Sequence, residues 1–73
     1  MSNKTLRDLR DQTVKSREEV ARELHTTGRM VDAYENGTRR LGIKQVFILA
    51  KFYNCTVGEV IRAESNSYRR KNE

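Results

Sequence analysis

The sequence predicts an all-α fold made of five short helices. Three observations indicate it: the chain contains no proline, apolar residues recur every three or four positions, and the Ser/Thr-X-X-Glu pattern of a helix capping box occurs at residues 16–19 and 56–59. Runs of β-branched residues, which favour strands, are absent. With 73 residues, the chain is expected to form one small, compact domain that buries about 60% of its unfolded surface.

Capping and stop signals define the predicted helices. The first three cover residues 4–12, 17–24 and 28–36, and two further helices begin after Gly42 and Thr56. In the first capping box the Ser16 hydroxyl accepts from the amide of Glu19, whose carboxylate accepts from the amide of Ser16. Thr27 is the predicted N-cap of the third helix. Gly37 supplies the left-handed residue that closes it.

Each predicted helix carries apolar residues expected to face one core. These are Leu6 and Leu9 in the first helix, Val20, Ala21 and Leu24 in the second, and Val31 and Tyr34 in the third. The fourth helix is the most apolar and is predicted to form the centre of the core with Ile43, Val46, Phe47, Leu49, Ala50, Phe52 and Tyr53. The fifth is expected to bury Val57, Val60 and Ile61.

The polar run ESNSYRRKNE follows Ala63. Because it carries no apolar stripe, it is predicted to have no core to join and to be frayed. The sequence therefore divides into a domain at residues 1–64 and a flexible basic tail at residues 65–73.

The charge is basic and unevenly distributed. The net charge is +5, and the sequence pI is about 9.8. Residues 1–38 hold seven Lys/Arg and seven Asp/Glu, whereas residues 39–73 hold eight and three. The excess therefore lies entirely in the second half. Such a balance indicates a polyanionic partner, and nucleic acid is the leading candidate.

The composition argues against several other classes. One cysteine, Cys55, excludes an internal disulfide, and with the single His25 it provides no metal-ligand cluster. No nucleophile with a neighbouring base and no phosphate-binding loop is visible, so neither an enzyme nor a cofactor is expected. No apolar run approaches the length of a membrane span, and the N-terminus lacks the apolar segment of a secretory signal. The predicted location is the cytoplasm.

Two stretches of the sequence, in the order in which they occur, resemble a known family. SREEVARELHTTGRMVDAYENG covers the second and third helices, and ILAKFYNCTVGEVI covers the closing helices. Together they make residues 6–62 similar to the Cro/CI-type (Xre, lambda-repressor-like) helix-turn-helix family, which includes small single-domain regulators of phages and mobile elements. The resemblance implies a five-helix lambda-repressor-like fold, double-stranded DNA as the partner, association with the nucleoid and, commonly, a homodimer.

The resemblance also implies which residues read bases. In the family the third helix lies in the major groove, and the corresponding positions here are Thr27, Gly28, Arg29, Asp32 and Ala33. Arg29 can bridge the O6 and N7 atoms of guanine. Alternatively, Arg29 pairs with Asp32 as an exposed i,i+3 ion pair. Both interpretations hold together if Asp32 aims Arg29, and Asp32 could itself accept from a cytosine amine.

A second set of residues is implied to contact phosphates, because the family places the start of the second helix and the loop after the third against the DNA backbone. The set comprises Arg17, Thr26, Thr38, Arg39, Arg40 and Lys44. For Arg39 and Arg40 the alternative is a solvated loop. Contacts of this kind give affinity and register rather than sequence preference.

Four other positions have structural interpretations. The resemblance implies that Glu35 makes an intramolecular contact that fixes the end of the third helix, and that Cys55 is a small buried group. It also places His25 in a left-handed turn, a conformation that costs about 1 kcal/mol without glycine. Lys15 stands where an apolar residue normally packs against Val20, so that staple is missing unless Val14 supplies it.

Two functions remain open from the sequence. The first is a Cro-like repressor that binds duplex DNA. The second is an anti-repressor or modulator that binds a partner CI-type repressor through its helix-turn-helix surface. The second is motivated by the net negative third helix and by Gly28, which offers no side chain for reading a base.

Overall fold

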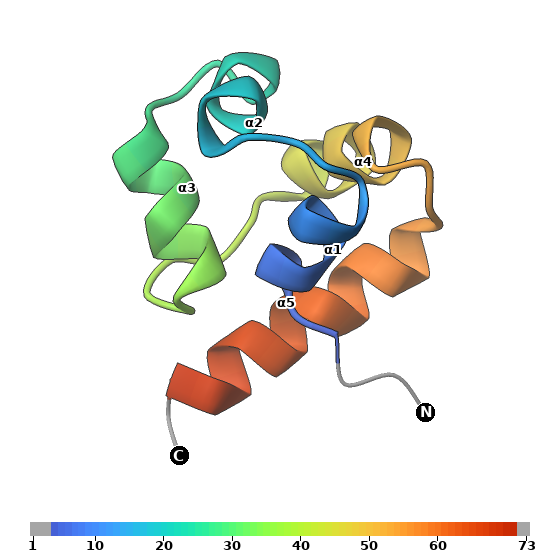
Figure 1. The fold of residues 1–73 in the computed structure, drawn as a ribbon. Helices are drawn as coiled ribbons and strands as arrows, with labels where there is room; N and C mark the ends of the chain where they lie inside the picture. The colour runs from blue at the N-terminus through green and yellow to red at the C-terminus, as the bar shows by residue number, and fades with distance from the viewer. Residues whose placement is uncertain (1–3, 72–73) are drawn as a thin grey trace.

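The computed structural model of the chain describes residues 4–71, and the side chains of residues 4–68. It contains five helices and, within the described residues, no strand. The helices are α1 (Leu6–Gln12), α2 (Arg17–Glu23), α3 (Gly28–Glu35), α4 (Ile43–Phe52) and α5 (Val57–Lys71). Figure 1 shows α1 in the middle of the molecule, with α2 and α3 on one side, α4 on the other and α5 crossing below. The predicted all-α, five-helix fold is confirmed.

None of these helices combines the length and the apolarity that crossing a bilayer requires, within the part of the chain that the structure describes.

The predicted capping signals begin the helices where the sequence places them. The Ser16 hydroxyl accepts from the amide of Glu19 at 3.1 Å, and the Glu19 carboxylate accepts from the amide of Ser16 at 2.8 Å. This backbone hydrogen bond lowers the pKa of Glu19. Thr56 and Glu59 form the same pair of bonds at the start of α5. A third box, formed by Thr5 and not predicted, begins α1.

Left-handed residues end the first four helices. Gly37 has φ 79° and His25 has φ 57°, as the sequence predicts. Val14 and Asn54, at φ 56° and 55°, occupy the same place after α1 and α4 and were not predicted. Each residue follows a helix C-cap, where a positive φ lets the chain leave the helix while the last carbonyls remain hydrogen-bonded.

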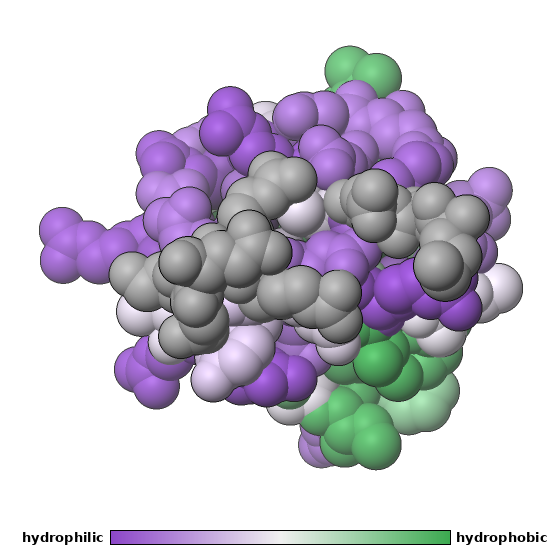
Figure 2. Space-filling view, turned by 90° about the horizontal axis from the view of Figure 1, so that it is seen from below, coloured by the Kyte–Doolittle hydropathy of each residue, from purple (hydrophilic) through white to green (hydrophobic). Residues whose placement is uncertain are grey.

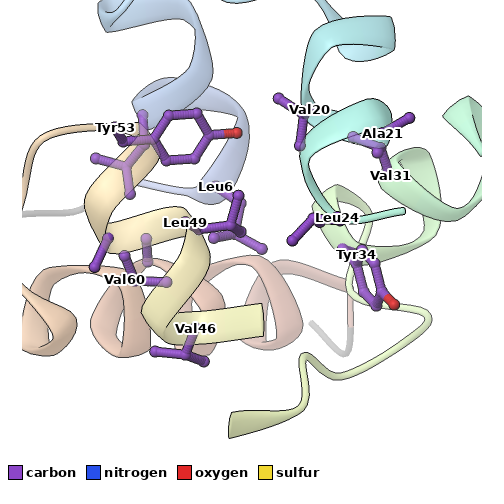
Figure 3. Close-up of a cluster of buried hydrophobic side chains, with 13 residues drawn as sticks. Leu6, Val20, Ala21, Leu24, Val31, Tyr34, Val46, Leu49, Tyr53 and Val60 are labelled. Carbon is purple, nitrogen blue, oxygen red and sulfur yellow. The ribbon is translucent and has the colours of Figure 1, made fainter. Parts of the chain in front are cut away.

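The core draws side chains from all five helices (Figure 3). Its buried members are Leu6, Leu9, Val20, Ala21, Leu24, Val31, Tyr34, Val46, Leu49, Ala50, Tyr53, Val60 and Ala63. The predicted inward faces of the first three helices are therefore confirmed. Phe52, Cys55 and Val57 pack against this cluster as partly buried residues.

Three residues predicted to be buried are exposed instead. Ile43 is 76% exposed, Phe47 57% and Ile61 49%. Phe47 and Ile61 each follow a buried valine, and one position along a helix turns a side chain by about 100°, away from the buried stripe. Ile43 is the first residue of α4 and lies beyond the part of the stripe that neighbouring helices cover. Figure 2 shows hydrophobic residues gathered on one side of the lower face of the molecule.

The residues after Ala63 join the fold, contrary to the prediction. Helix α5 continues to Lys71, and Glu64 and Ser67 are buried. The Ser67 hydroxyl accepts from the amide of Leu6 at 3.1 Å. The polar residues of this segment thus hydrogen-bond to the start of α1, a mode of packing that an apolar pattern does not reveal. Residues 72–73 of the predicted tail lie outside the described residues.

Val14 does not supply the missing staple. Val14 is 87% exposed, because its left-handed backbone directs the side chain into solvent. Lys15 takes part in the packing instead, with its ammonium 4.8 Å from the centre of the Phe52 ring.

An ion pair joins α1 to the last residue of α3. Arg10 donates from Nε and Nη2 to the two carboxylate oxygens of Glu35, at 2.6 and 3.2 Å. The hydrogen bond to Glu35 raises the pKa of Arg10. The two side chains are only 16% and 8% exposed. The intramolecular role expected for Glu35 is confirmed.

Removing one member of this pair should destabilise the fold strongly. Arg10→Met would leave Glu35 charged and nearly buried, so we expect it to lower the free energy of unfolding by about 3 kcal/mol. Urea denaturation followed by circular dichroism measures this. The matched control is Arg7→Met, which removes the exposed Arg7–Asp11 pair and should cost less than about 0.5 kcal/mol. Equal effects of the two substitutions would contradict the importance of the Arg10–Glu35 pair.

Replacing Val14 by glycine should stabilise the protein. The Val14 side chain is almost fully exposed, and its backbone φ is 56°. Glycine would remove backbone strain of about 1–2 kcal/mol. It would also raise the entropy of the unfolded chain, which costs about 0.4–1 kcal/mol of stability. We expect a net increase of about 0.5–1 kcal/mol in unfolding free energy, measured in urea. Ile61→Gly, at a half-exposed helical position, should instead lower stability by about 1 kcal/mol. A loss of stability with Val14→Gly would show that backbone strain does not govern this turn.

Candidate nucleic-acid interface

Helices α2 and α3 are joined by a tight turn. The Thr26 amide donates to the carbonyl of Ala21 at 2.8 Å, and the His25 amide donates to the carbonyl of Arg22 at 3.2 Å. Thr27 then begins α3, and its hydroxyl accepts from the amide of Met30 at 3.3 Å. These bonds satisfy the backbone groups at the helix ends and set the angle between the two helices.

The inner side of α3 is anchored in the core. Val31 and Tyr34 are buried, and in Figure 3 they lie on the side of α3 that faces α2, with Ala21 and Leu24. The Tyr34 hydroxyl accepts from the side-chain amide of Gln45 at 2.9 Å, which links α3 to α4. The orientation of α3 is therefore determined by packing and by a hydrogen bond at a buried residue.

The outer side of α3 carries the residues predicted to read bases. Thr27 and Arg29 are exposed, and Gly28, Asp32 and Ala33 are half-buried. The structure thus brings all five to one accessible surface next to the helix-turn-helix turn. The Thr27 hydroxyl is already used as the helix cap.

The predicted Arg29–Asp32 pair is not formed. Asp32 accepts instead from Arg17, with 2.7 Å between Oδ2 and Nη1. No hydrogen bond or ion pair to Arg29 is made by the side chains that the structure describes. The cation at the start of α2 therefore compensates the acid on α3, while Arg29 extends into solvent.

Arg17 lies directly over the first turn of α3. A Cβ atom added to Gly28 would be 3.0 Å from the Arg17 Nε and 3.6 Å from its Cδ and Cζ. Nε also meets the Glu18 carboxylate at 3.4 Å. The absence of a side chain at Gly28 is thus what gives the guanidinium room against α3.

The four residues after α3 that are predicted to contact phosphates fall into two groups. Thr38, Arg39 and Lys44 are exposed, although the amides of Thr38 and Arg39 both donate to the Ala33 carbonyl. Arg40 is engaged within the protein: its Nε lies 3.6 Å from the Glu64 carboxylate.

Two side chains of α5 hold the loop that carries Arg40. The Glu64 carboxylate also accepts from the amide of Leu41, and the Arg40 guanidinium carbon lies 4.7 Å from the centre of the Tyr68 ring. Sequence reasoning missed this arrangement because 24 positions separate Arg40 from Glu64 and no pattern connects them.

A polar cleft of about 450 Å³ lies beside α3. It is lined by Arg7, Arg10, Ser16, Arg17, Glu18, Asp32, Glu35 and Asn36. Its three arginines are matched by three acids, so the cleft is not a strongly cationic pocket. Arg7 was not predicted to lie near the α3 surface, and the packing of α1 against α3 brings it there.

Neither Cys55 nor His25 lines this cleft. Cys55 is half-buried, and this burial raises the pKa of its thiol. Among the described residues, no group of three or more His, Cys, Asp or Glu side chains could hold a metal ion.

The comparison with protein families agrees with this geometry. A helix-turn-helix family model of the Cro/C1 type matches residues 6–60, which span α1 to the first turn of α5. No curated protein and no solved structure gives a significant match. The match covers most of the 73 residues, and the chain therefore belongs to the Cro/C1-type helix-turn-helix family of DNA-binding proteins.

Proposed function

We propose that the chain is a sequence-specific regulator of transcription that binds duplex DNA with α3 in the major groove. The observation that carries the proposal is the division of α3 into two sides. Val31 and Tyr34 fix one side to the core, and the residues at 27–29 and 32–33 form the other, accessible side. A helix anchored in this way can enter a groove about 12 Å wide without losing its packing.

The charges around α3 support the same docking. Arg17 lies at one end of the helix-turn-helix unit, and the exposed Arg39 and Lys44 follow α3. Arg39 and Lys44 can contact phosphates beside the groove, and Arg17 adds positive charge near the other end of α3. Arg40 pairs with Glu64 and so holds the loop on α5, and its exposed side chain keeps the predicted phosphate contact as a proposal.

The proposed mode of action is occupation of a promoter, without catalysis, as a Cro-like repressor acts. DNA as the partner places the protein with the nucleoid in the cytoplasm.

We further propose that two copies bind one operator through an apolar patch on α4. The patch consists of Ile43 and Phe47, which are exposed and one helical turn apart. A two-fold pair of helix-turn-helix units reads half-sites about 34 Å apart. Two side chains cover far less than the roughly 800 Å² per partner of a stable interface, so the pair is expected to assemble on DNA rather than in free solution.

Binding should depend on salt and on the cations that flank α3. We expect the affinity for duplex DNA to fall with salt, with a log–log slope of about 0.9 for each phosphate contacted. Arg39→Ala and Lys44→Ala should each weaken binding to all duplexes and reduce the slope by about one contact. Fluorescence anisotropy over a salt series, with duplexes from the region upstream of the gene, measures this.

The matched control is Arg62→Ala, which removes an exposed cation of α5 outside the proposed interface and should leave the slope unchanged. If all three variants lower the slope equally, the attraction is a general effect of net charge and the proposed docking is wrong. If the protein shifts no DNA alone but alters the shift given by the product of a neighbouring repressor gene, the anti-repressor function is supported instead.

Disrupting the apolar patch should uncouple the two copies. We expect sedimentation analysis to give one copy in free solution and two copies per operator duplex. Phe47→Glu should give one copy per duplex and an apparent affinity about tenfold lower. Val14→Glu is the control, because Val14 is exposed but lies outside the patch. Two copies per duplex with Phe47→Glu would contradict the proposed contact.

A further inference from the structure

The first turn of α3 offers few side chains to DNA. Gly28 has none, and the Thr27 hydroxyl caps the helix by accepting from the amide of Met30. Ala33 supplies only a methyl group, and Asp32 is a carboxylate, which repels the DNA backbone unless it is compensated. Arg29 is the one cation in the sequence of α3 itself.

The guanidinium of Arg17 occupies the space that a side chain at position 28 would take. A Cβ atom there would lie 3.0 Å from Nε, so the Arg17 side chain would have to shift by a few tenths of an ångström, and 3.6 Å from Cζ, an ordinary van der Waals contact. No positive φ distinguishes Gly28, so its backbone does not require glycine. Glycine at this position therefore leaves room for the Arg17 side chain.

Asp32 then fixes the position of that guanidinium. Its Oδ2 lies 2.7 Å from Nη1 of Arg17, and residues 28 and 32 lie on one face of the helix because they are four positions apart. The charged end of Arg17 consequently lies along the same face as the predicted base-reading positions. Glu18 contacts Nε at 3.4 Å, and Nη2 makes no hydrogen bond within residues 4–68.

We infer that Arg17 is a specificity-determining residue that reads a guanine in place of the missing side chain at Gly28. The inference rests on the proposed DNA-binding function. The O6 and N7 atoms of guanine form the acceptor pair that matches a guanidinium edge. Asp32 is a positioning residue that accepts from Arg17, and it is not a partner of cytosine. The negative charge on α3 is thereby neutralised by the group that reads the base.

The test separates base reading from phosphate contact. The full chain is used to select duplexes from a pool with a randomised segment about two helical turns long, and wild type is compared with Arg17→Ala, Gly28→Ala and Asp32→Asn. We expect wild type to prefer guanine at one position of each half-site. Replacing that guanine by adenine should weaken its binding roughly 5- to 150-fold, the range expected of one bidentate arginine–guanine contact.

Gly28→Ala is the sharpest variant because it keeps every charge and introduces a better helix former. Its methyl group should push the Arg17 side chain away from α3 by a few tenths of an ångström, so we expect the guanine preference to weaken while the salt slope stays that of wild type. Arg17→Ala should lose the same preference and also one contact from the slope. Asp32→Asn should weaken the preference without abolishing binding. Cooperative thermal unfolding with a midpoint above the binding temperature in each variant excludes loss of the fold as the cause.

Two results would overturn the inference in different ways. If Arg17→Ala weakens all duplexes equally and retains the guanine preference, Arg17 is a phosphate contact, and the proposed function stands without this inference. If wild type selects no duplex and shows no salt-dependent binding, the proposed function itself is wrong and the inference falls with it.

Discussion

The ion pair between Arg10 and Glu35 fixes the end of the helix on which the candidate interface is built. Its two hydrogen bonds, at 2.6 and 3.2 Å, connect the first helix to the last residue of α3. A helix of eight residues is too short to be stable alone, so α3 depends on such contacts for its existence as well as its direction. Val31 and Tyr34 fix its inner side, and Glu35 fixes its exit. The accessible side follows from these constraints.

Local chemistry accounts for the parts of the fold that the sequence predicted well. The boxes at Ser16 and Thr56 involve residues three positions apart, and Gly37 is selected by the backbone of a single residue. Interactions within one helical turn leave a pattern that can be read directly. Val14 and Asn54 adopt the same left-handed conformation as Gly37; asparagine tolerates this conformation better than most residues, whereas valine disfavours it.

Contacts between distant residues account for what the sequence could not show. Ser67 bonds to the amide of Leu6 across 61 positions, so a polar segment without an apolar stripe becomes part of α5 and of the packed fold. The apolar run of α4 was equally ambiguous, because it contains more hydrophobic residues than one helix face can bury. Which of them remain exposed depends on the neighbours of α4, and here these are Ile43 and Phe47.

The ion pairs of the candidate interface could not be predicted from the sequence either. From the sequence, Asp32 and Glu35 make α3 net negative, and the nearest candidate partner for Asp32 is Arg29. In the folded chain each acid is instead matched by an arginine from another helix, Arg17 for Asp32 and Arg10 for Glu35. The acids of α3 are therefore used to hold α1 and α2 in place, and Arg29 is left with its full charge.

Residue 28 also depends on a contact with another helix. A glycine at the first turn of a recognition helix costs helix stability relative to alanine and removes a reading side chain, so in the sequence it counts against the site. In the structure the guanidinium of Arg17 fills the vacated space and is bonded to Asp32 one turn later. A side chain at residue 28 would crowd the cation that compensates the helix. The glycine and the ion pair are thus parts of one arrangement, in which the missing side chain at position 28 leaves room for a cation on that face of α3.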